Sequence, residues 1–167
     1  MLMRNALAWG VEDRVLGVQV GMPDTKFADA SFDAAFSTTT LEMIRGMQGE
    51  TTYRQCLVEV QRILKHGALF GYGDPMHLPV EIPSDLAPLI EGDWATCFVT
   101  LDETIDAFIA VGFEIIEAGY ATDARLWWEE FTQHSPECKA NPNGDTHIIE
   151  VDANRWVSFG YVIARKP

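Results

Sequence analysis

Two tryptophans and two glutamates stand next to each other in the C-terminal third of this sequence, at Trp127, Trp128, Glu129 and Glu130. Aromatic faces near carboxylates bind cationic amines by cation–π attraction, which is worth about 0.5 to 2 kcal/mol, and they also bind apolar rings. The alternative is that one Trp packs in the core while the glutamates face water. The hypothesis that uses this chemistry makes Trp127 and Trp128 candidate substrate-binding residues.

A tyrosine and an aspartate lie in the stretch Gly71-Tyr72-Gly73-Asp74-Pro75, directly after an apolar segment. A Tyr or Asp side chain at such a position can orient or deprotonate a reacting group. The alternative is a simple turn in which Asp precedes Pro. Tyr72 and Asp74 are the candidate catalytic residues.

A run of hydroxyl side chains, from Ser37 to Thr40, follows another short apolar segment. Hydroxyl groups and the backbone donors beside them can hold a polar ligand without bulk. The same run is also typical of a turn and a helix N-cap.

Cys56, Cys97 and Cys138 are widely spaced and form no metal-binding pattern with the four histidines. We therefore expect reduced thiols and no metal site.

Composition and charge limit the classes of partner. The chain has 167 residues, 47% of them apolar, which suits one globular domain over residues 1–167. Its 12 basic and 25 acidic residues give a net charge of -13, and such a field repels nucleic acids and anionic membranes. No apolar run approaches the roughly 18 to 20 residues that span a bilayer. We expect a cytoplasmic protein whose partner is a small molecule, with neither nucleic acid nor membrane bound.

The hydrophobic period changes repeatedly between helical and extended values, which indicates an α/β fold. Prolines at positions 75, 79, 83 and 88 interrupt the region 73–98, so we expect an irregular or short-helical insertion there. Thr100 and Glu103 form a capping-box pattern, and the helix that they start stops at Gly112. The pattern predicts helices at 2–9, 52–64, 101–111 and 125–131, a polar loop at 136–145, and strands at 14–20, 32–36, 68–72, 113–116 and 156–164, the last antiparallel and at the end of the sheet.

The predicted sheet brings the candidate residues together. In an open α/β sheet, ligands bind beyond the carboxyl ends of the strands. The loops after Val20, Phe36 and Tyr72 are therefore expected to line one crevice.

Several short motifs occur in an order that is typical of one family. They are Phe27 to Asp33 (F-A-D-A-S-F-D), Thr40-Leu41-Glu42, Glu59 to Gly67 (E-V-x-R-I-L-K-x-G), Gly112 to Glu114 (G-F-E) and the closing Arg155 to Pro167. In this order and spacing the sequence resembles the second half of a class I S-adenosylmethionine-dependent methyltransferase, of the broad group that includes the ubiquinone-biosynthesis and sterol methyltransferases. The resemblance implies a Rossmann-like methyltransferase sheet with an antiparallel C-terminal strand.

The resemblance also implies a function, namely an enzyme that transfers a methyl group from S-adenosylmethionine to a small-molecule acceptor. The 73–98 insertion and the Trp127 region would bind the acceptor. Among the residues placed on the cofactor side are Ser37, Thr38 and Thr39. Gly21, Met22 and Asp24 stand where many relatives have a Gly-Asp pair that contacts the adenine amine. Because the sulfonium donor is already activated, catalysis is largely in-line positioning and desolvation, and no catalytic triad is expected.

The sequence departs from the family in its first half. The glycine-rich G-x-G-x-G turn and the acidic residue that ends the second strand have no counterpart in the chain. With the family's sheet order, 3-2-1-4-5-7-6, the strand at 14–20 would lack a neighbour. We expect an N-terminally truncated domain that acts as part of a longer protein. A rearranged sheet and a homodimer that completes the sheet are the alternatives.

Two other functions stay open. Without the glycine-rich turn, the chain can be a non-catalytic methyltransferase-like remnant that acts as a binding or regulatory subunit. The second is a nicotinamide-dependent oxidoreductase on a similar sheet. The antiparallel closing strand and the lack of a dinucleotide fingerprint argue against it.

Overall fold

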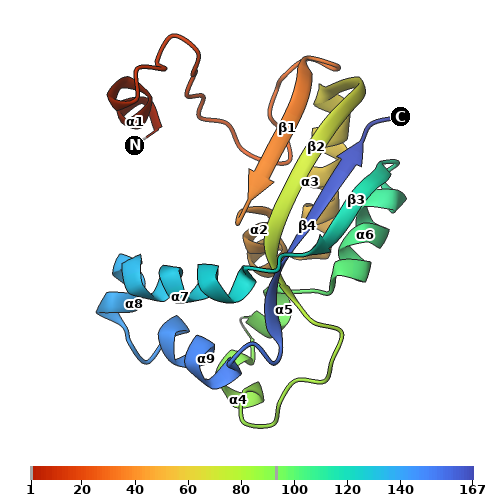
Figure 1. Ribbon diagram of the computed structural model, residues 1–167. Helices are drawn as coiled ribbons and strands as arrows, with labels where there is room; N and C mark the ends of the chain where they lie inside the picture. The colour runs from red at the N-terminus through yellow and green to blue at the C-terminus, as the bar shows by residue number, and fades with distance from the viewer. Residues whose placement is uncertain (1, 93) are drawn as a thin grey trace.

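The computed structural model of the chain describes residues 2–92 and 94–167 (Figure 1). The helices are α1 (Leu2–Ala8), α2 (Leu41–Gln48), α3 (Glu50–Ile63), α4 (Ala87–Ile90), α5 (Trp94–Cys97), α6 (Leu101–Ala110), α7 (Ala124–His134), α8 (Pro136–Ala140) and α9 (Asp145–Asp152). The strands are β1 (Phe32–Thr38), β2 (Leu64–His77), β3 (Glu114–Tyr120) and β4 (Val157–Arg165). The predicted α/β fold class is confirmed. Among the described helices, none combines the length and the apolar character that a membrane crossing needs.

The described strands form one mixed sheet in the order β1-β2-β4-β3. β1 and β2 are parallel, with Phe36 opposite Gly71, whereas β4 is antiparallel to both of its neighbours. The predicted antiparallel C-terminal strand is therefore confirmed. Its predicted place at the end of the sheet is wrong, because β3 pairs with the far side of β4 and takes the edge position.

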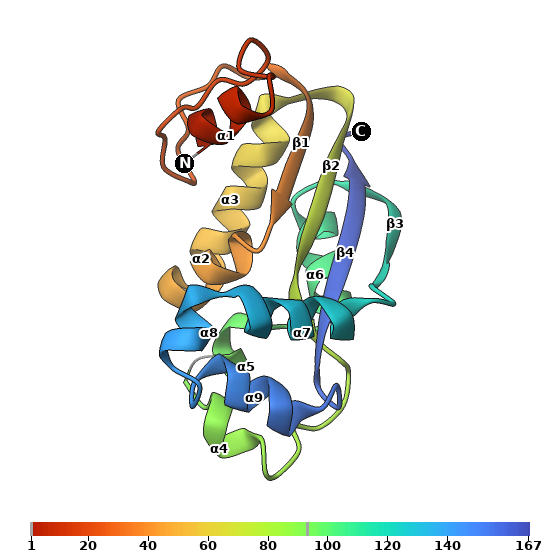
Figure 2. The same cartoon turned by 60° about the vertical axis from the view of Figure 1, so that its left-hand side comes forward.

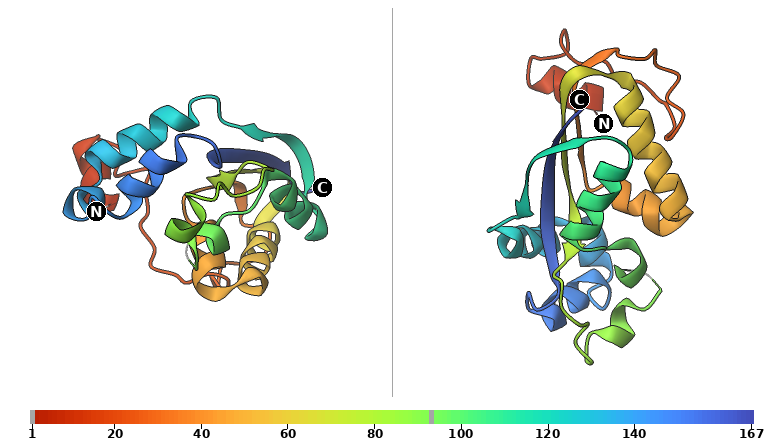
Figure 3. Two further views of the ribbon diagram at one scale, coloured as in Figure 1. Left: turned by 90° about the horizontal axis from the view of Figure 1, so that it is seen from below. Right: turned by 90° about the vertical axis from the view of Figure 1, so that its right-hand side faces the viewer.

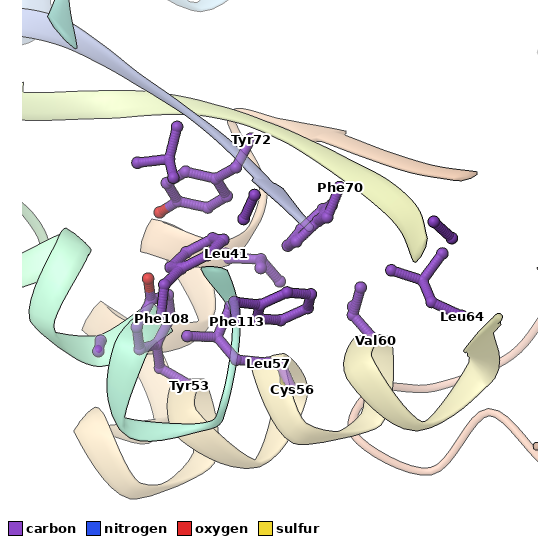
Figure 4. Packing of buried hydrophobic residues seen from close by; sticks show 14 of the residues in the cluster. Leu41, Tyr53, Cys56, Leu57, Val60, Leu64, Phe70, Tyr72, Phe108 and Phe113 are labelled. Atoms are coloured by element: carbon purple, nitrogen blue, oxygen red, sulfur yellow. The ribbon is translucent and has the colours of Figure 1, made fainter. Parts of the chain in front are cut away.

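One face of the sheet is covered by helices α3 and α6 (Figures 1 and 3). The helix predicted at 52–64 corresponds to α3, and its apolar stripe is buried there, since Tyr53, Cys56 and Leu57 have no exposed surface. Phe70 of β2 stacks on Phe108 of α6, with ring centroids 5.5 Å apart (Figure 4). Full burial of a Leu or Phe side chain stabilises a fold by about 1.5 to 3 kcal/mol. This cluster is therefore the main core of the domain.

A second buried cluster joins the short helices α4, α5 and α9 to the start of β4. Its members are Leu86, Ile90, Trp94, Phe98, Ile148, Trp156 and Val157. Figure 1 shows these helices gathered with α7 and α8 at one end of the sheet, where β1 and β2 finish. The division into one domain with an insertion at 73–98 stays a prediction, and Asp93 of that insertion lies outside the described residues.

The opposite face of the sheet stays open along most of its length in the described part of the chain (Figure 3). Apolar side chains on it are exposed, Phe36 of β1 by 78% and Leu69 of β2 by 42%. Parallel strands are normally covered by helices on both faces. The exposure of Phe36 and Leu69 follows from the lack of a second helical layer over these residues.

Local signals set the two ends of α6. The Thr100 hydroxyl accepts a hydrogen bond from the Glu103 N–H (3.2 Å), and the Glu103 carboxylate accepts one from the Thr100 N–H (2.8 Å). The predicted capping box is confirmed. Gly112 has a φ of 93°, a left-handed value that glycine adopts at little cost, and it follows the end of the helix.

Residues 14–20 form no strand, contrary to the prediction from their alternation. Leu16 is 83% exposed and Val18 is 51% exposed. No strand of the described residues pairs with this segment. A strand is stable only when its backbone groups pair with a neighbour, so alternation without a neighbour does not produce one.

β2 is longer than predicted and runs through Pro75 to His77, although we expected the irregular region to begin at residue 73. β1 pairs with β2 only as far as Gly73. The N–H that Pro75 lacks therefore falls on a locally unpaired edge of the strand, where proline is tolerated.

The predicted polar loop at 136–145 contains the helix α8 and leads into α9. α8 begins at Pro136 after Ser135, whose hydroxyl accepts a hydrogen bond from the Cys138 N–H (3.3 Å). Ser at the N-cap followed by Pro in the first turn is a helix-start signal. The loop prediction was wrong because it weighed polarity above this signal.

Candidate functional site

A pocket of about 490 Å³ lies at the carboxyl ends of β1 and β2. Figure 2 shows α7 crossing this end of the sheet, with α5 and α9 beyond it. Six aromatic side chains form most of the pocket wall, and they come from α5, α7, β4 and the segment after α5. The lining residues are Thr39, Glu42, Met43, Pro75, Trp94, Phe98, Trp127, Trp128, Phe131, Asp145 and Phe159.

The aromatic wall is held by ring contacts between elements. Trp128 of α7 stacks on Trp94 of α5, with ring centroids 5.5 Å apart and an interplanar angle of 28°. Phe131, one helical turn further along α7, meets Trp128 edge to face at 5.9 Å. Trp127 meets Phe159 of β4 edge to face at 5.4 Å and stays 45% exposed. Trp127 and Trp128, the predicted substrate-binding residues, thus stand together in one pocket wall.

Behind the pocket wall lies a buried pair of carboxyl groups, Asp74 of β2 and Glu42 of α2, of which Glu42 lines the pocket. Asp74 has no exposed surface, and its two carboxyl oxygens accept hydrogen bonds from the backbone N–H groups of Thr40 (3.2 Å) and Glu42 (3.1 Å). These are N–H groups at the start of α2, which have no partner within the helix. Asp74 therefore ties the start of α2 to β2.

Glu42 is only 3% exposed, although it stands in the first turn of a helix. Burial, together with the hydrogen bond and the negative charge of Asp74, raises the pKa of Glu42 to about 9. Burial also raises the pKa of Asp74, while its hydrogen bonds, the one with Glu42 first, lower it. A Glu42 carboxyl group with a pKa of about 9 is protonated at neutral pH. The pocket wall therefore presents a neutral carboxylic acid.

Tyr72, a predicted catalytic residue, points into the main core rather than into the aromatic pocket (Figure 4). It is 2% exposed and meets Phe108 edge to face at 5.2 Å. Burial raises the pKa of its hydroxyl well above the ordinary value. Asp74, the other predicted catalytic residue, reaches the pocket only through Glu42. The catalytic roles of both residues stay predictions.

The hydroxyl run on the cofactor side lies at the carboxyl end of β1, next to the pocket. Ser37 and Thr38 pair with Tyr72 and Gly73 of β2. Thr39 lines the pocket and has a φ of 47°, a left-handed value that costs a β-branched residue about 1 to 3 kcal/mol. Its N–H donates a hydrogen bond to the Gly73 carbonyl (3.0 Å), which holds this conformation in place.

Gly21, Met22 and Asp24, the other predicted cofactor residues, are not among the residues that line this pocket. Met22 packs against the main core, and Asp24 forms an exposed ion pair with Lys26. The segment is fastened to α3 through the backbone N–H of Thr25, which donates to the Glu59 carboxylate (3.0 Å). The structure therefore does not bring these three residues to Thr39 and Trp127.

Arg62 stabilises the charged form of Glu59, the residue to which Thr25 bonds. Its guanidinium donates two hydrogen bonds of 2.8 Å to the Glu59 carboxylate, one from Nε and one from Nη2. These bonds, with those from Thr25, lower the pKa of Glu59 to about 2.

In the described part of the chain, no group of three His, Cys, Asp or Glu residues is arranged to hold a metal ion.

Comparison with known proteins places this geometry in a class. Residues 4–71 match the family described as methyltransferase domain. The sterol methyltransferase-like 1 protein of Botryococcus braunii is 31% identical over 130 residues, which cover 72% of this chain and 32% of that protein. These matches and the shared fold support a class I S-adenosylmethionine-dependent methyltransferase, as the resemblance implied. Within that class, the sequence relative is a sterol methyltransferase-like protein.

Solved structures share the fold. The [4+2]-cyclase SpnF matches with a TM-score of 0.72 and 18% identity, over 99% of this chain and 61% of that chain. The geranyl diphosphate C-methyltransferase of Streptomyces coelicolor A3(2), solved with Mg²⁺, geranyl diphosphate and S-adenosyl-L-homocysteine, matches with a TM-score of 0.72 and 17% identity, over 99% of this chain and 58% of that chain. The predicted Rossmann-like methyltransferase sheet is thereby confirmed. The chain spans about one third of the length of its sequence relative and about three fifths of these structures.

Sequence reasoning missed several members of the pocket, above all Glu42, Trp94 and Phe159. The position of Glu42 in the first turn of a helix that follows a strand could have indicated a site residue. Trp94 and Phe159 carry no such signal, because only the packing of α5 and β4 around α7 brings them together.

Proposed function

We propose that this protein takes part in the transfer of a methyl group from S-adenosylmethionine to a small-molecule acceptor, and that the aromatic pocket holds the acceptor. The observation that supports this proposal is the position of the pocket at the carboxyl ends of β1 and β2, where open α/β sheets bind their ligands. S-adenosylmethionine supplies a methyl group on a sulfonium that is already activated. What the protein must add is the orientation of the acceptor and the exclusion of water.

Six of the predicted site residues have a role in this proposal. Trp127 and Trp128 hold the acceptor through their ring faces. The donor lies on the side of Ser37, Thr38 and Thr39, where hydroxyl and backbone groups stand at the carboxyl end of β1. Asp74 acts as a positioning residue, because it fixes the start of α2 and the carboxyl group of Glu42.

The donor site is the part of the proposal that reaches beyond these 167 residues. The chain contains no G-x-G-x-G turn, and its hydroxyl run provides only part of the contacts that a donor of that size needs. We therefore include in the proposal that the chain acts within a longer protein, whose glycine-rich turn completes the donor site.

Isothermal titration calorimetry with S-adenosylhomocysteine tests this function. The titration compares the 167-residue chain with the same chain preceded by the sequence encoded upstream of it. We expect the extended chain to bind with a Kd in about the micromolar range and the short chain to bind at least about tenfold more weakly. Tight binding by the short chain would instead favour a dimer-completed site, which sedimentation would detect as a dimer. If neither chain binds, the proposed function is wrong.

A matched pair of serine variants locates the donor side. Ser37→Ala removes a hydroxyl at the carboxyl end of β1 and should weaken S-adenosylhomocysteine binding by about three- to tenfold. Ser31→Ala removes an exposed hydroxyl at the other end of β1, which bonds only to the Ala28 carbonyl. It should leave the binding unchanged. Equal effects of the two variants would contradict the placement of the donor.

A further inference from the structure

Two polar groups of the pocket wall are left without a hydrogen-bond partner in the described structure. One is the indole N–H of Trp128 (Nε1), and the other is an oxygen of the Glu42 carboxyl group (Oε2). A buried polar atom without a partner costs about 1 to 3 kcal/mol, and most such atoms in folded proteins are paired. Because both side chains line the same pocket, we expect a bound ligand to supply the missing partners.

The two groups have opposite hydrogen-bonding character. The indole N–H of Trp128 can only donate. The Glu42 carboxyl group makes its hydrogen bond with another acid, Asp74, and two carboxyl groups can bond only through a proton that lies between them. The oxygen of Glu42 that takes no part in this bond therefore carries no proton, and it accepts. An ionised Glu42 would accept in the same way, so this assignment holds in both protonation states.

Helix α5 connects the two parts of the wall that carry these groups. Gly46, one turn after Glu42 on α2, lies against the thiol of Cys97 on α5, where a side-chain carbon would not fit. Trp94 of the same short helix stacks on Trp128 of α7, with ring centroids 5.5 Å apart. This arrangement favours a ligand whose donor and acceptor belong to one small group.

The rest of the wall limits the charge and the polarity of the ligand. Six aromatic side chains make it mainly apolar, which favours rings and hydrocarbon. No Lys, Arg or His stands among the described residues of the lining, so an anionic ligand would lie beside Glu42 and Asp145 without a countercharge. A cationic amine lacks the lone pair that the Trp128 N–H requires. A hydroxyl group meets both requirements without charge, because its O–H donates and its oxygen accepts.

We propose that the pocket selects an uncharged, mainly apolar ligand that carries a hydroxyl group, and that this group donates a hydrogen bond to Glu42 and accepts one from Trp128. Glu42 and Trp128 are thus specificity-determining residues. A hydroxyl reproduces the hydrogen bonds that water makes with such groups, which a hydrocarbon cannot do. That this ligand is the methyl acceptor rests on the proposed function, whereas the preference for a hydroxyl does not, and it can be measured without a methyl donor.

Four naphthalene derivatives with different polar groups test the preference by calorimetry at neutral pH. 2-Naphthalenemethanol donates and accepts, 2-acetylnaphthalene only accepts, 2-naphthylmethylamine is cationic and only donates, and 2-ethylnaphthalene does neither. We expect the alcohol to bind about tenfold more tightly than the hydrocarbon of the same shape, and the ketone about threefold more tightly, as two added hydrogen bonds and one allow.

Three results would overturn the proposal. The first is equal binding of the alcohol and the hydrocarbon. The second is a ketone or an ammonium that binds at least as tightly as the alcohol. The third is a lack of binding by all four probes.

Variants assign the preference to the two side chains. Trp128→Phe keeps a ring but loses the N–H, so the advantage of the alcohol should fall about threefold and the ketone should bind like the hydrocarbon. Glu42→Met removes the accepting oxygen at similar length, so the alcohol should bind no better than the ketone. Glu42→Gln should keep the preference, because its amide N–H₂ can donate to Asp74 while its C=O still accepts. Glu129→Gln, outside the wall, is the matched control and should change nothing.

The ratio of alcohol to hydrocarbon affinity within each variant removes general effects of a substitution on the pocket, since the hydrocarbon uses neither group. A ratio that is the same as in the wild type in both Trp128→Phe and Glu42→Met would overturn the assignment. If Glu42→Met does not fold, the ratio in Trp128→Phe decides. Because S-adenosylhomocysteine binding is a separate titration, failure of this preference and failure of the proposed function are distinguishable.

Discussion

Asp74 shows how one buried carboxylate on a strand can organise a neighbouring helix. It accepts hydrogen bonds from two backbone N–H groups at the start of α2 and stands beside the carboxyl group of Glu42. The predicted role at this position, to orient or deprotonate a reacting group, stays a prediction. The structure places Asp74 one step behind the pocket wall, where it sets the position of Glu42 and raises the pKa of that carboxyl group.

Replacement of Asp74 should therefore destabilise the fold. Asp74→Asn keeps one accepting oxygen but turns an N–H₂ group toward a backbone N–H, which leaves a buried donor unpaired at a cost of about 1 to 3 kcal/mol. Urea unfolding followed by circular dichroism measures this change. The control is Asp33→Asn, which removes an exposed ion pair with Lys65 (2.6 Å) and should change stability by less than about 0.5 kcal/mol. Similar losses in both variants would contradict the buried role of Asp74.

Glu42 should make stability fall as the pH rises. Its pKa is 4.5 as an ordinary glutamate and about 9 in the folded protein, so between these values the folded state binds more protons than the unfolded state. The free energy of unfolding then decreases across that window, by up to about 1.4 kcal/mol per pH unit for one proton. Glu59 has the opposite sign and acts below this window, because its folded pKa is about 2.

Urea unfolding of the wild-type protein and of Glu42→Gln at several pH values between about 5 and 8.5 checks this linkage. The variant cannot titrate at this position, so its stability should depend less on pH and exceed that of the wild type at the alkaline end. Parallel pH profiles for the two proteins would show that Glu42 is ionised in the folded state.

At the scale of single elements, the cap of α6 is a feature that four residues of sequence predict completely. Thr100→Ala removes the hydroxyl that accepts from the Glu103 N–H and should cost about 1 kcal/mol. Thermal and urea unfolding measure the loss. Thr132→Ala on α7 is the comparison, because it lacks a capping role and alanine has the higher helix propensity. A loss in Thr132→Ala as large as in Thr100→Ala would argue against the capping box as the cause.

Elements with local signals were predictable, and elements that depend on distant partners were not. The helix predicted at 52–64 agrees with α3, since helical periodicity is a local property. The strand predicted at 14–20 failed because no strand of the described residues pairs with it. The order of β3 and β4 could not follow from their sequences, because either strand can occupy an edge.

The residues of the candidate site divide in the same way, into those that local signals predict and those that depend on tertiary packing. Trp127, Trp128 and Thr39 were placed in the site by their own residue types and by the rule for strand ends, and they do line one pocket. Glu42 was missed because its burial comes from tertiary packing, which no periodicity in α2 reveals. Gly21, Met22 and Asp24 were assigned by resemblance, and the structure places them away from the aromatic pocket.

At the scale of the whole molecule, the two buried clusters should open with different ease. The main core contains the sheet and the fourteen-residue helix α3, whereas the second cluster includes α4 and α5, of four residues each. Short helices satisfy few of their own backbone groups and open at low free energy. Hydrogen exchange followed by mass spectrometry should show fast exchange in 87–97 and slow exchange in β2 and β4. Uniform protection of both regions would mean that the clusters unfold as one unit.

The position of β4 between β2 and β3 has a consequence for how the chain is made. β3 spans 114–120, yet its partner in the sheet is β4 at 157–165. During synthesis the ribosome releases β3 well before β4, so β3 waits with both edges unpaired while α7, α8 and α9 emerge. Contacts between such distant segments form late and slow folding, and an unpaired edge is a site of mispairing between nascent chains. β4 therefore completes the sheet in a late step of folding, when it pairs with both β2 and β3.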